Sequence, residues 1–159
     1  MTRAMRRFKQ QLSVEEVERI LRNGKYCVMA VSGDDGYPYA VPVNYVYVYD
    51  GTAIFIHSAA QGHKIDALIR NPKCSLCMVD KDDVIPEEFT SYFRSVIVFG
   101  KAHFVETTDE KIAALRLLGD KYSPGIDPEA EIARFIKTVS ILRIDIESAS
   151  GKEAIELTK

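Results

Sequence analysis

The sequence predicts a mainly β fold: a small antiparallel barrel with short helices at its ends. Tight hairpin signals, Gly33-Asp34-Asp35-Gly36 and Asp50-Gly51, each follow a strand-like segment. The helical segments are short and lie between only some of the strands, which disfavours alternating βαβ units. About six strands in one chain of this size would leave exposed edges unless the sheet closed on itself, so a barrel is the expected architecture.

Length and composition fit one ordinary globular domain. The chain has 159 residues, 28% of them charged and 47% hydrophobic, so we expect a single domain over 1–159 with extended tails at 1–11 and 150–159. A net charge of −2 gives no reason to expect nucleic acid or a membrane surface as partner. The three cysteines lie in apolar strand-like segments, so we expect reduced core thiols and a cytoplasmic protein.

The first half of the chain carries recognisable start and stop signals. Ser13 precedes a helix that ends at Asn23-Gly24. A strand over 26–31 is followed by a long return strand over 37–49, in which Pro38 and Pro42 favour a sheet edge or a bulge.

The second half alternates strands and helices. We expect Gly100 to mark a bulge inside the longest strand. The predicted segments are strands over 52–56, 73–79, 92–106 and 139–146, a polar loop over 80–91, helices over 64–70, 108–122 and 128–136, and a tail over 148–159 that lies on the surface or on a partner.

The stretch from His57 to Lys64 joins a buried strand to a helix start. Free backbone N–H groups and the positive end of the helix dipole meet there. Ser58 adds a hydroxyl, Gly62 adds flexibility and Lys64 adds a cation, so the stretch is a candidate phosphate cradle. The alternative is a capped surface helix with a solvated lysine.

Other chemistry finds little support in the sequence. No serine lies in a nucleophile elbow, and no histidine is within motif distance of an exposed cysteine. His57, His63 and His103 have no carboxylate at ligand spacing, so we expect no metal site. The proline-broken segment from Tyr39 to Tyr45 offers aromatic walls and free backbone groups, which favours binding of a flat, partly apolar anion.

Three motifs in this order resemble a known family: Pro38 to Tyr45, Phe55 to Lys64, and Tyr92 to Gly100. Over about residues 5 to 155 the chain resembles the FMN-binding split-barrel proteins related to pyridoxamine 5′-phosphate oxidase. It is most similar to their nitroimidazole-resistance (Nim-like) branch.

This resemblance implies a six-stranded antiparallel split β-barrel, assembled as a homodimer with FMN at the subunit interface. Pro42 to Tyr45 would line the isoalloxazine through backbone groups, with His57 near the ring. The phosphate would be held at the helix start, and a segment of the second subunit would complete the site. The implied cofactor-binding residues are Val41, Pro42, Val43, Asn44, Tyr45, His57, Ser58, Ala59, Gly62, His63, Lys64, Arg94 and Ser95.

The resemblance also implies an FMN-dependent oxidoreductase that passes electrons from NADH or NADPH to a small aromatic or nitro-aromatic acceptor. His57 and Tyr92 are the catalytic candidates, because both could face the ring. Lys152 is the only basic side chain before the last residue of the tail where pyridoxamine phosphate oxidases have arginine and histidine, so we do not expect that substrate. The alternatives are a non-catalytic flavin-binding, storage or sensing module, a haem-binding or deazaflavin-dependent relative, and a purely structural dimer.

Overall fold

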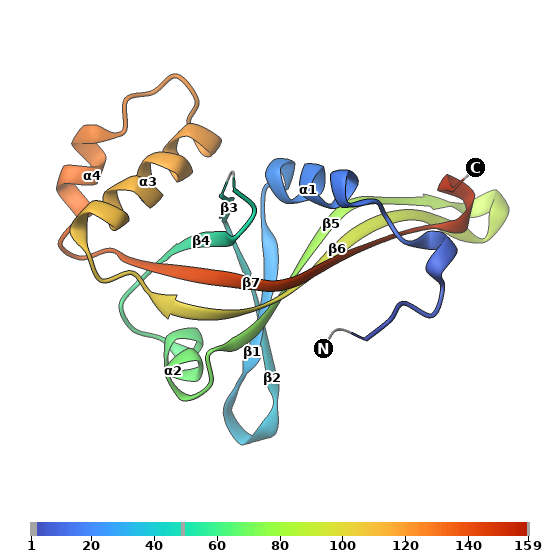
Figure 1. Cartoon of the computed structure of the whole chain (residues 1–159), viewed down its shortest axis with the longest axis horizontal. Coiled ribbons are helices and arrows are strands. Elements are labelled where there is room, and N and C mark those ends of the chain that lie inside the picture. The colour runs from blue at the N-terminus through green and yellow to red at the C-terminus, as the bar shows by residue number, and fades with distance from the viewer. Residues whose placement is uncertain (1–2, 49, 159) are drawn as a thin grey trace.

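The computed structural model of the chain describes residues 3–48 and 50–158. Tyr49 and the outermost residues of both predicted tails lie outside these ranges. One antiparallel sheet runs through the described residues in the order β2-β1-β5-β6-β7-β4-β3 (Figure 1). Its strands are β1 (Cys27–Ser32), β2 (Pro38–Val43), β3 (Val46–Tyr47), β4 (Ala53–Ser58), β5 (Lys73–Ile85), β6 (Thr90–Phe104) and β7 (Ser140–Glu153).

Four α-helices accompany the sheet in the described ranges: α1 (Val14–Asn23), α2 (His63–Arg70), α3 (Thr108–Tyr122) and α4 (Glu129–Phe135). The predicted cap of α1 is confirmed, because the Ser13 hydroxyl accepts a hydrogen bond from the Glu16 N–H at 3.2 Å. Helices α3 and α4 form a lobe at one end of the molecule, and the turn between β5 and β6 projects at the other (Figure 1).

The sheet curls into a barrel that is split at one seam. Strand β2 forms one edge and β3 the other, yet only Asn44 and Tyr45 separate them in the chain. Two residues span only about 7–11 Å of chain, so the ends of the two edge strands lie close together. No backbone ladder between β2 and β3 is seen in the described residues. The predicted mainly β split barrel is confirmed. The sheet has seven strands rather than six, because the expected return strand breaks after Val43.

Two hydrophobic clusters meet at β4. Ile54 and Ile56 point into the main core under α1, whereas Phe55 packs with Leu118 and Ile141 beneath α3. Residues Ala53 to Ile56 are therefore all buried. Burial on both sides fixes the end of β4, which leads into the predicted phosphate stretch.

The polar loop predicted over 80–91 is wrong. Strand β5 continues to Ile85, a 3-10 turn covers Pro86–Glu88, and β6 begins at Thr90. We call the part from Asp80 to Arg94 the arm. Most of its side chains are in solvent on both faces, so its strands lack the alternating apolar pattern that predicts a strand.

The surface tail predicted from Ser148 is also corrected, because β7 pairs with β6 as far as Glu153. The Leu12 N–H donates to the Gly151 carbonyl at 3.0 Å, so the two chain ends lie together. The bulge predicted at Gly100 is confirmed, since the β6–β7 register shifts between Phe99 and Gly100. A β-carbon at Gly100 would lie 2.5 Å from the Asp145 carbonyl oxygen, so the bulge needs glycine.

Candidate functional site

The turn between β4 and α2 encloses a cavity of about 380 Å³, which we call the cradle cavity. The edge strand β2 contributes two lining residues, and the end of β4, the turn after it and the start of α2 contribute the rest. The predicted residues that line it are Val41, His57, Ser58, Ala59, Gly62, His63 and Lys64, and the additional ones are Tyr39, Gln61 and Ile65.

The start of α2 is open toward this cavity. Gly62 is the N-cap, and no side chain caps the helix. The φ of Gly62 is +134°, a backbone conformation that favours glycine, and a β-carbon there would meet no atom within 4 Å. The first amides of α2 therefore have room for an external acceptor beside them.

Lys64 supplies the cation of the cradle cavity. It lies in the first turn of α2, and among the described residues its ammonium has no ion-pair or hydrogen-bond partner. Burial lowers the pKa of Lys64 from its ordinary value, because desolvation disfavours the charged form. An unpaired, partly buried cation beside free helix amides is a binding group for an anion.

His63 closes one side of the cavity. Its imidazole stacks on Tyr39 with 4.0 Å between ring centroids, and its Nε2 lies 3.7 Å from an Asp34 carboxylate oxygen. Arg70, at the other end of α2, donates to the same carboxylate at 2.6 Å. Asp34 therefore ties the C-terminal end of α2 to the β1–β2 turn through Arg70 and lies close to His63 at the helix start.

His57 occupies a junction between two hollows. Its exposed side chain lines the cradle cavity and also a larger cleft of about 960 Å³ that lies against α3 and α4. Ser58 and Ala59 line both hollows as well, and Asn44 lines only the larger one. A ligand anchored at the start of α2 would therefore lie beside His57.

Tyr45 does not line either hollow. Its fully buried ring lies in the main core, with the Lys121 ammonium 3.8 Å from the ring centroid. The Tyr45 N–H donates to the Tyr122 hydroxyl at 3.0 Å, and the Tyr45 carbonyl accepts from Lys121 at 2.8 Å. Burial lowers the pKa of Lys121 to about 8. Residues of α3 thus hydrogen-bond the Tyr45 backbone groups that we expected to bind a flavin ring. Pro42 and Val43, which were also expected to line the ring, are absent from the cavity lining.

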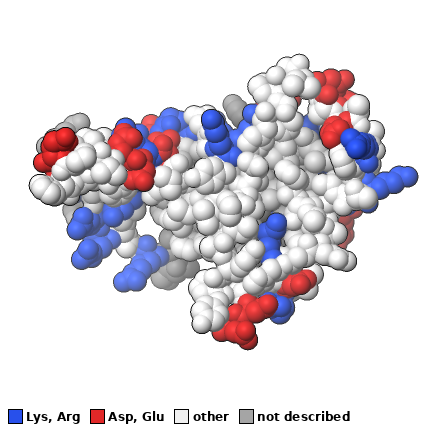
Figure 2. Space-filling model, turned by 180° about the vertical axis from the view of Figure 1, so that it is seen from behind, with Lys and Arg blue, Asp and Glu red and all other residues white. Residues whose placement is uncertain are grey.

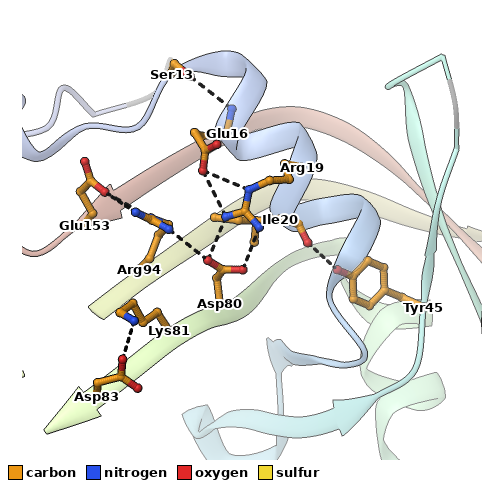
Figure 3. Close-up of polar contacts among 10 residues, drawn as sticks. All are labelled: Ser13, Glu16, Arg19, Ile20, Tyr45, Asp80, Lys81, Asp83, Arg94 and Glu153. Carbon is orange, nitrogen blue, oxygen red and sulfur yellow. Dashed lines mark hydrogen bonds and ion pairs between the residues drawn. The ribbon is translucent and has the colours of Figure 1, made fainter. Parts of the chain in front are cut away.

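Arg94 and Ser95 lie on β6 at the base of the arm, outside the cradle cavity. Arg94 donates to Glu153 at 3.0 Å and lies 3.6 Å from Asp80, which in turn accepts from Arg19 at 2.9 Å (Figure 3). These pairs join α1 to the arm and to β7. Tyr92 donates to Glu88 at 2.8 Å within the arm. Within one protomer neither Arg94, Ser95 nor Tyr92 lines the cavity.

The predicted set of cofactor-binding residues omitted three that line the cavity, Tyr39, Gln61 and Ile65. Tyr39 begins the segment that was predicted to offer aromatic walls, and it alternates with Val41 and Val43 on one face of β2, where all three pack against the main core. Gln61 lies inside the stretch from His57 to Lys64 that was predicted as the phosphate cradle. Within the described residues, no cluster of three or more His, Cys, Asp or Glu side chains could hold a metal ion, and no helix is long and apolar enough to cross a membrane.

Comparison with known proteins decides the family. A family model described as pyridoxamine 5′-phosphate oxidase matches residues 13–153. The chain belongs to this family. No curated protein matches it.

Solved structures share the fold. A candidate 5-nitroimidazole antibiotic resistance protein from Bacteroides thetaiotaomicron is 23% identical, with 90% of this chain and 86% of that chain covered and a TM-score of 0.75. A flavocytochrome from Azotobacter vinelandii is 23% identical over 96% and 73% of the two chains, with a TM-score of 0.79. An FAD-binding protein from Mesorhizobium loti is 25% identical over 91% and 97%, with a TM-score of 0.66. These similarities, together with the family model, assign the split-barrel fold of pyridoxamine 5′-phosphate oxidase to the chain.

Proposed function

We propose that this member of the pyridoxamine 5′-phosphate oxidase family is a flavoprotein whose cradle cavity holds the phosphate of FMN. The observation that carries the proposal is Lys64, a partly buried ammonium without an anionic partner among the described residues. The uncapped amides of α2 and the open space beside Gly62 complete an anion site. The structural neighbours include an FAD-binding protein and a flavocytochrome, which supports a flavin as the ligand.

Phosphate contacts alone are too weak to hold the cofactor. A partly buried anion at a helix start gains up to about 2 kcal/mol, and charge-assisted hydrogen bonds contribute ~1.5–3 kcal/mol each. Micromolar affinity needs about 8 kcal/mol, so burial of the flavin ring must supply much of the remainder. The cradle cavity is polar and open, so the ring needs a second surface.

The outer face of the sheet offers that surface to a second copy. Directly paired residues in a ladder share a face, and two ladder rows on this face contain no charged side chain. The rows are Pro42, Val28, Cys77, Ile97 and Ser150, and Ala40, Ala30, Ser75, Phe99 and Ser148. In the view from behind, a broad uncharged area fills the middle of the molecule, with charged residues mostly gathered toward its edges (Figure 2).

We therefore propose a homodimer that pairs through this face, with one FMN at each cradle cavity. A broad uncharged face is typical of surfaces that are buried in an oligomer. In such a dimer Arg94 and Ser95 would contribute to the site of the partner subunit, as the resemblance implies, and Tyr92 lies on the same strand.

The proposed activity is electron transfer from NADH or NADPH to a small aromatic or nitro-aromatic acceptor. The flavin, when bound, supplies the redox chemistry: the nicotinamide loses a hydride, and the acceptor gains two electrons and two protons. The chain binds the phosphate through Lys64 and the first turn of α2, and the dimer interface excludes water from the flavin. His57, exposed beside the cavity, is the group proposed to donate a proton to the acceptor.

A flavin-binding module without turnover is the second candidate. It is favoured by His57 itself, because no described residue hydrogen-bonds or orients its ring, whereas an efficient acid–base catalyst is usually positioned by a partner.

The absorption spectrum of the purified protein, followed by anaerobic addition of NADH or NADPH, separates these candidates. Flavin bands that bleach support the oxidoreductase, and flavin bands that persist support the module. A protein that binds neither added FMN nor FAD contradicts both.

A further inference from the structure

A second hollow lies beside the cradle cavity, and we call it the lobe cleft. Its volume of about 960 Å³ lies between the end of β4 and the lobe formed by α3 and α4. This size is in the range of sites for drug-sized molecules. The segment from Thr108 to Phe135 builds one wall, and the turn after β4 builds the other.

The lobe cleft adjoins the cradle cavity. His57, Ser58 and Ala59 line both hollows, so a molecule in the cleft lies against the same turn that forms part of the cradle. A ligand in the cleft would therefore be next to a flavin whose phosphate is held by Lys64. This adjacency suits an electron acceptor, which must approach the flavin closely.

The lining of the lobe cleft is apolar. Leu118 and Ile132 are buried in its wall, while Ile126 and Phe135 are 68% and 41% exposed and open to it. An exposed aromatic ring next to aliphatic side chains suits a flat organic molecule.

The charged side chains of the lining are both acidic. They are Asp127 and Glu131, and the lining contains no lysine or arginine. Asp127 accepts a hydrogen bond from the Glu129 N–H at 3.1 Å, and no described residue forms an ion pair with Glu131. Two carboxylates without a lining cation repel an anionic ligand. The adenylate half of a dinucleotide, which carries phosphate, therefore does not fit this chemistry.

We propose that the lobe cleft binds the electron acceptor and selects an uncharged aromatic molecule over an anionic one. The inference rests on the proposed flavin function and adds the location of the acceptor and its charge class. The apolar wall binds the flat body of the acceptor, and Asp127 and Glu131 exclude carboxylates and phosphates.

The test uses flavin-loaded protein and two probes of almost the same shape, uncharged 4-nitrobenzamide and anionic 4-nitrobenzoate. Their dissociation constants are measured by calorimetry, and flavin affinity is measured separately by fluorescence quenching. We expect the amide to bind at least about tenfold more tightly than the carboxylate, and Glu131→Gln to narrow this ratio about threefold.

Location is tested with Ile126→Glu, which places a charge in the apolar wall. We expect this variant to bind the amide about tenfold more weakly with unchanged flavin affinity. Val14→Glu is the matched control, because Val14 on α1 is similarly exposed at 71% and lies outside the cleft. The control should bind both probes as the wild type does.

Three results would overturn the proposal. Equal affinity for the two probes contradicts the proposed selection against anions. Unchanged binding of 4-nitrobenzamide in Ile126→Glu contradicts the lobe cleft as the acceptor site. A dimer that becomes monomeric in Ile126→Glu, by analytical ultracentrifugation, shows that a second copy fills the cleft. Failure of the proposed flavin function appears differently, as absent flavin binding in the wild type, and removes the acceptor role with it.

Discussion

The imidazole of His63 stacks on the ring of Tyr39, with 4.0 Å between centroids and an angle of 28° between planes. The contact ties the edge strand β2 to the first residue of α2. Both residues line the cradle cavity, so this pair sets the distance between two of its walls.

Replacing Tyr39 with alanine removes this support. We expect FMN affinity to fall about three- to tenfold, because a stacked aromatic pair is worth about 0.5–1.5 kcal/mol. Tyr39→Phe keeps the ring and should bind as the wild type does. Fluorescence quenching of FMN provides the measurement, and equal affinities for the alanine and phenylalanine variants would contradict the role of the stack.

Lys64 makes flavin affinity depend on pH. Burial lowers its pKa below the ordinary 10.5, and a bound phosphate stabilises the charged form. Binding is therefore strongest while Lys64 is protonated, and FMN affinity falls as pH rises through the lowered pKa, earlier than for a solvated lysine. Lys64→Arg stays cationic and should keep its affinity to higher pH. Dissociation constants from pH 7 to 10.5 that follow the same course in both proteins would exclude Lys64 from the phosphate site.

Asp80 links the arm to α1 and should stabilise the fold above acidic pH. Hydrogen bonding from Arg19 lowers the pKa of Asp80 below 3.8, with Coulombic attraction from Arg19 and Arg94 adding to it. The stabilisation is present above the unfolded-state value and is lost as pH falls through the lower folded-state pKa.

We expect Asp80→Asn to lower the free energy of unfolding by about 1 kcal/mol at pH 7, and the difference from the wild type to shrink below pH 4. Asp83→Asn is the control, since among the described residues Asp83 forms its ion pair with Lys81 alone, in the solvent-exposed arm. Urea titrations at pH 7 and pH 3 measure these free energies. The same difference in free energy of unfolding between wild type and Asp80→Asn at both pH values would refute the stabilising role of the Asp80 carboxylate.

Phe99 lies in one of the two uncharged ladder rows on the outer face of the sheet, and 48% of it is exposed. Phe99→Asp places a carboxylate in the proposed dimer interface. We expect a monomer in analytical ultracentrifugation, with flavin affinity lowered at least about tenfold because the ring loses its second wall. The control is Val14→Asp, which also replaces an exposed apolar residue with aspartate but lies on α1, and this variant should stay dimeric. A Phe99→Asp protein that is still a flavin-loaded dimer would place the interface elsewhere.

Local sequence signals predicted the structure well where a single interaction determines the backbone. Ser13 predicts the start of α1 because its hydroxyl accepts from a first-turn amide, and Gly100 predicts a bulge because a β-carbon would strike the β7 backbone. The stretch from His57 to Lys64 was identifiable as a candidate anion site, because small residues and a cation lie together at a helix start.

The local signals failed in two situations: where a strand is exposed to solvent on both faces, and where the partners of a residue lie far away in the chain. The arm looked like a loop because solvent covers both of its faces, and Tyr45 looked available because its partners are on α3, Lys121 and Tyr122, far away in the chain. The lobe cleft depends on how α3 and α4 pack against β4, which no local pattern contains. The role proposed for Arg94 and Ser95 depends on a second copy, which no pattern within one chain contains.

The difference in affinity between FMN and riboflavin tests the central claim most directly, because the two ligands differ only in the phosphate. We expect the wild type to bind FMN about 10- to 100-fold more tightly than riboflavin, as charge-assisted hydrogen bonds of ~1.5–3 kcal/mol require. In Lys64→Ala most of that preference should disappear, whereas in Lys9→Ala it should stay. Equal binding of both flavins by the wild type, or an unchanged preference in Lys64→Ala, would contradict the phosphate cradle.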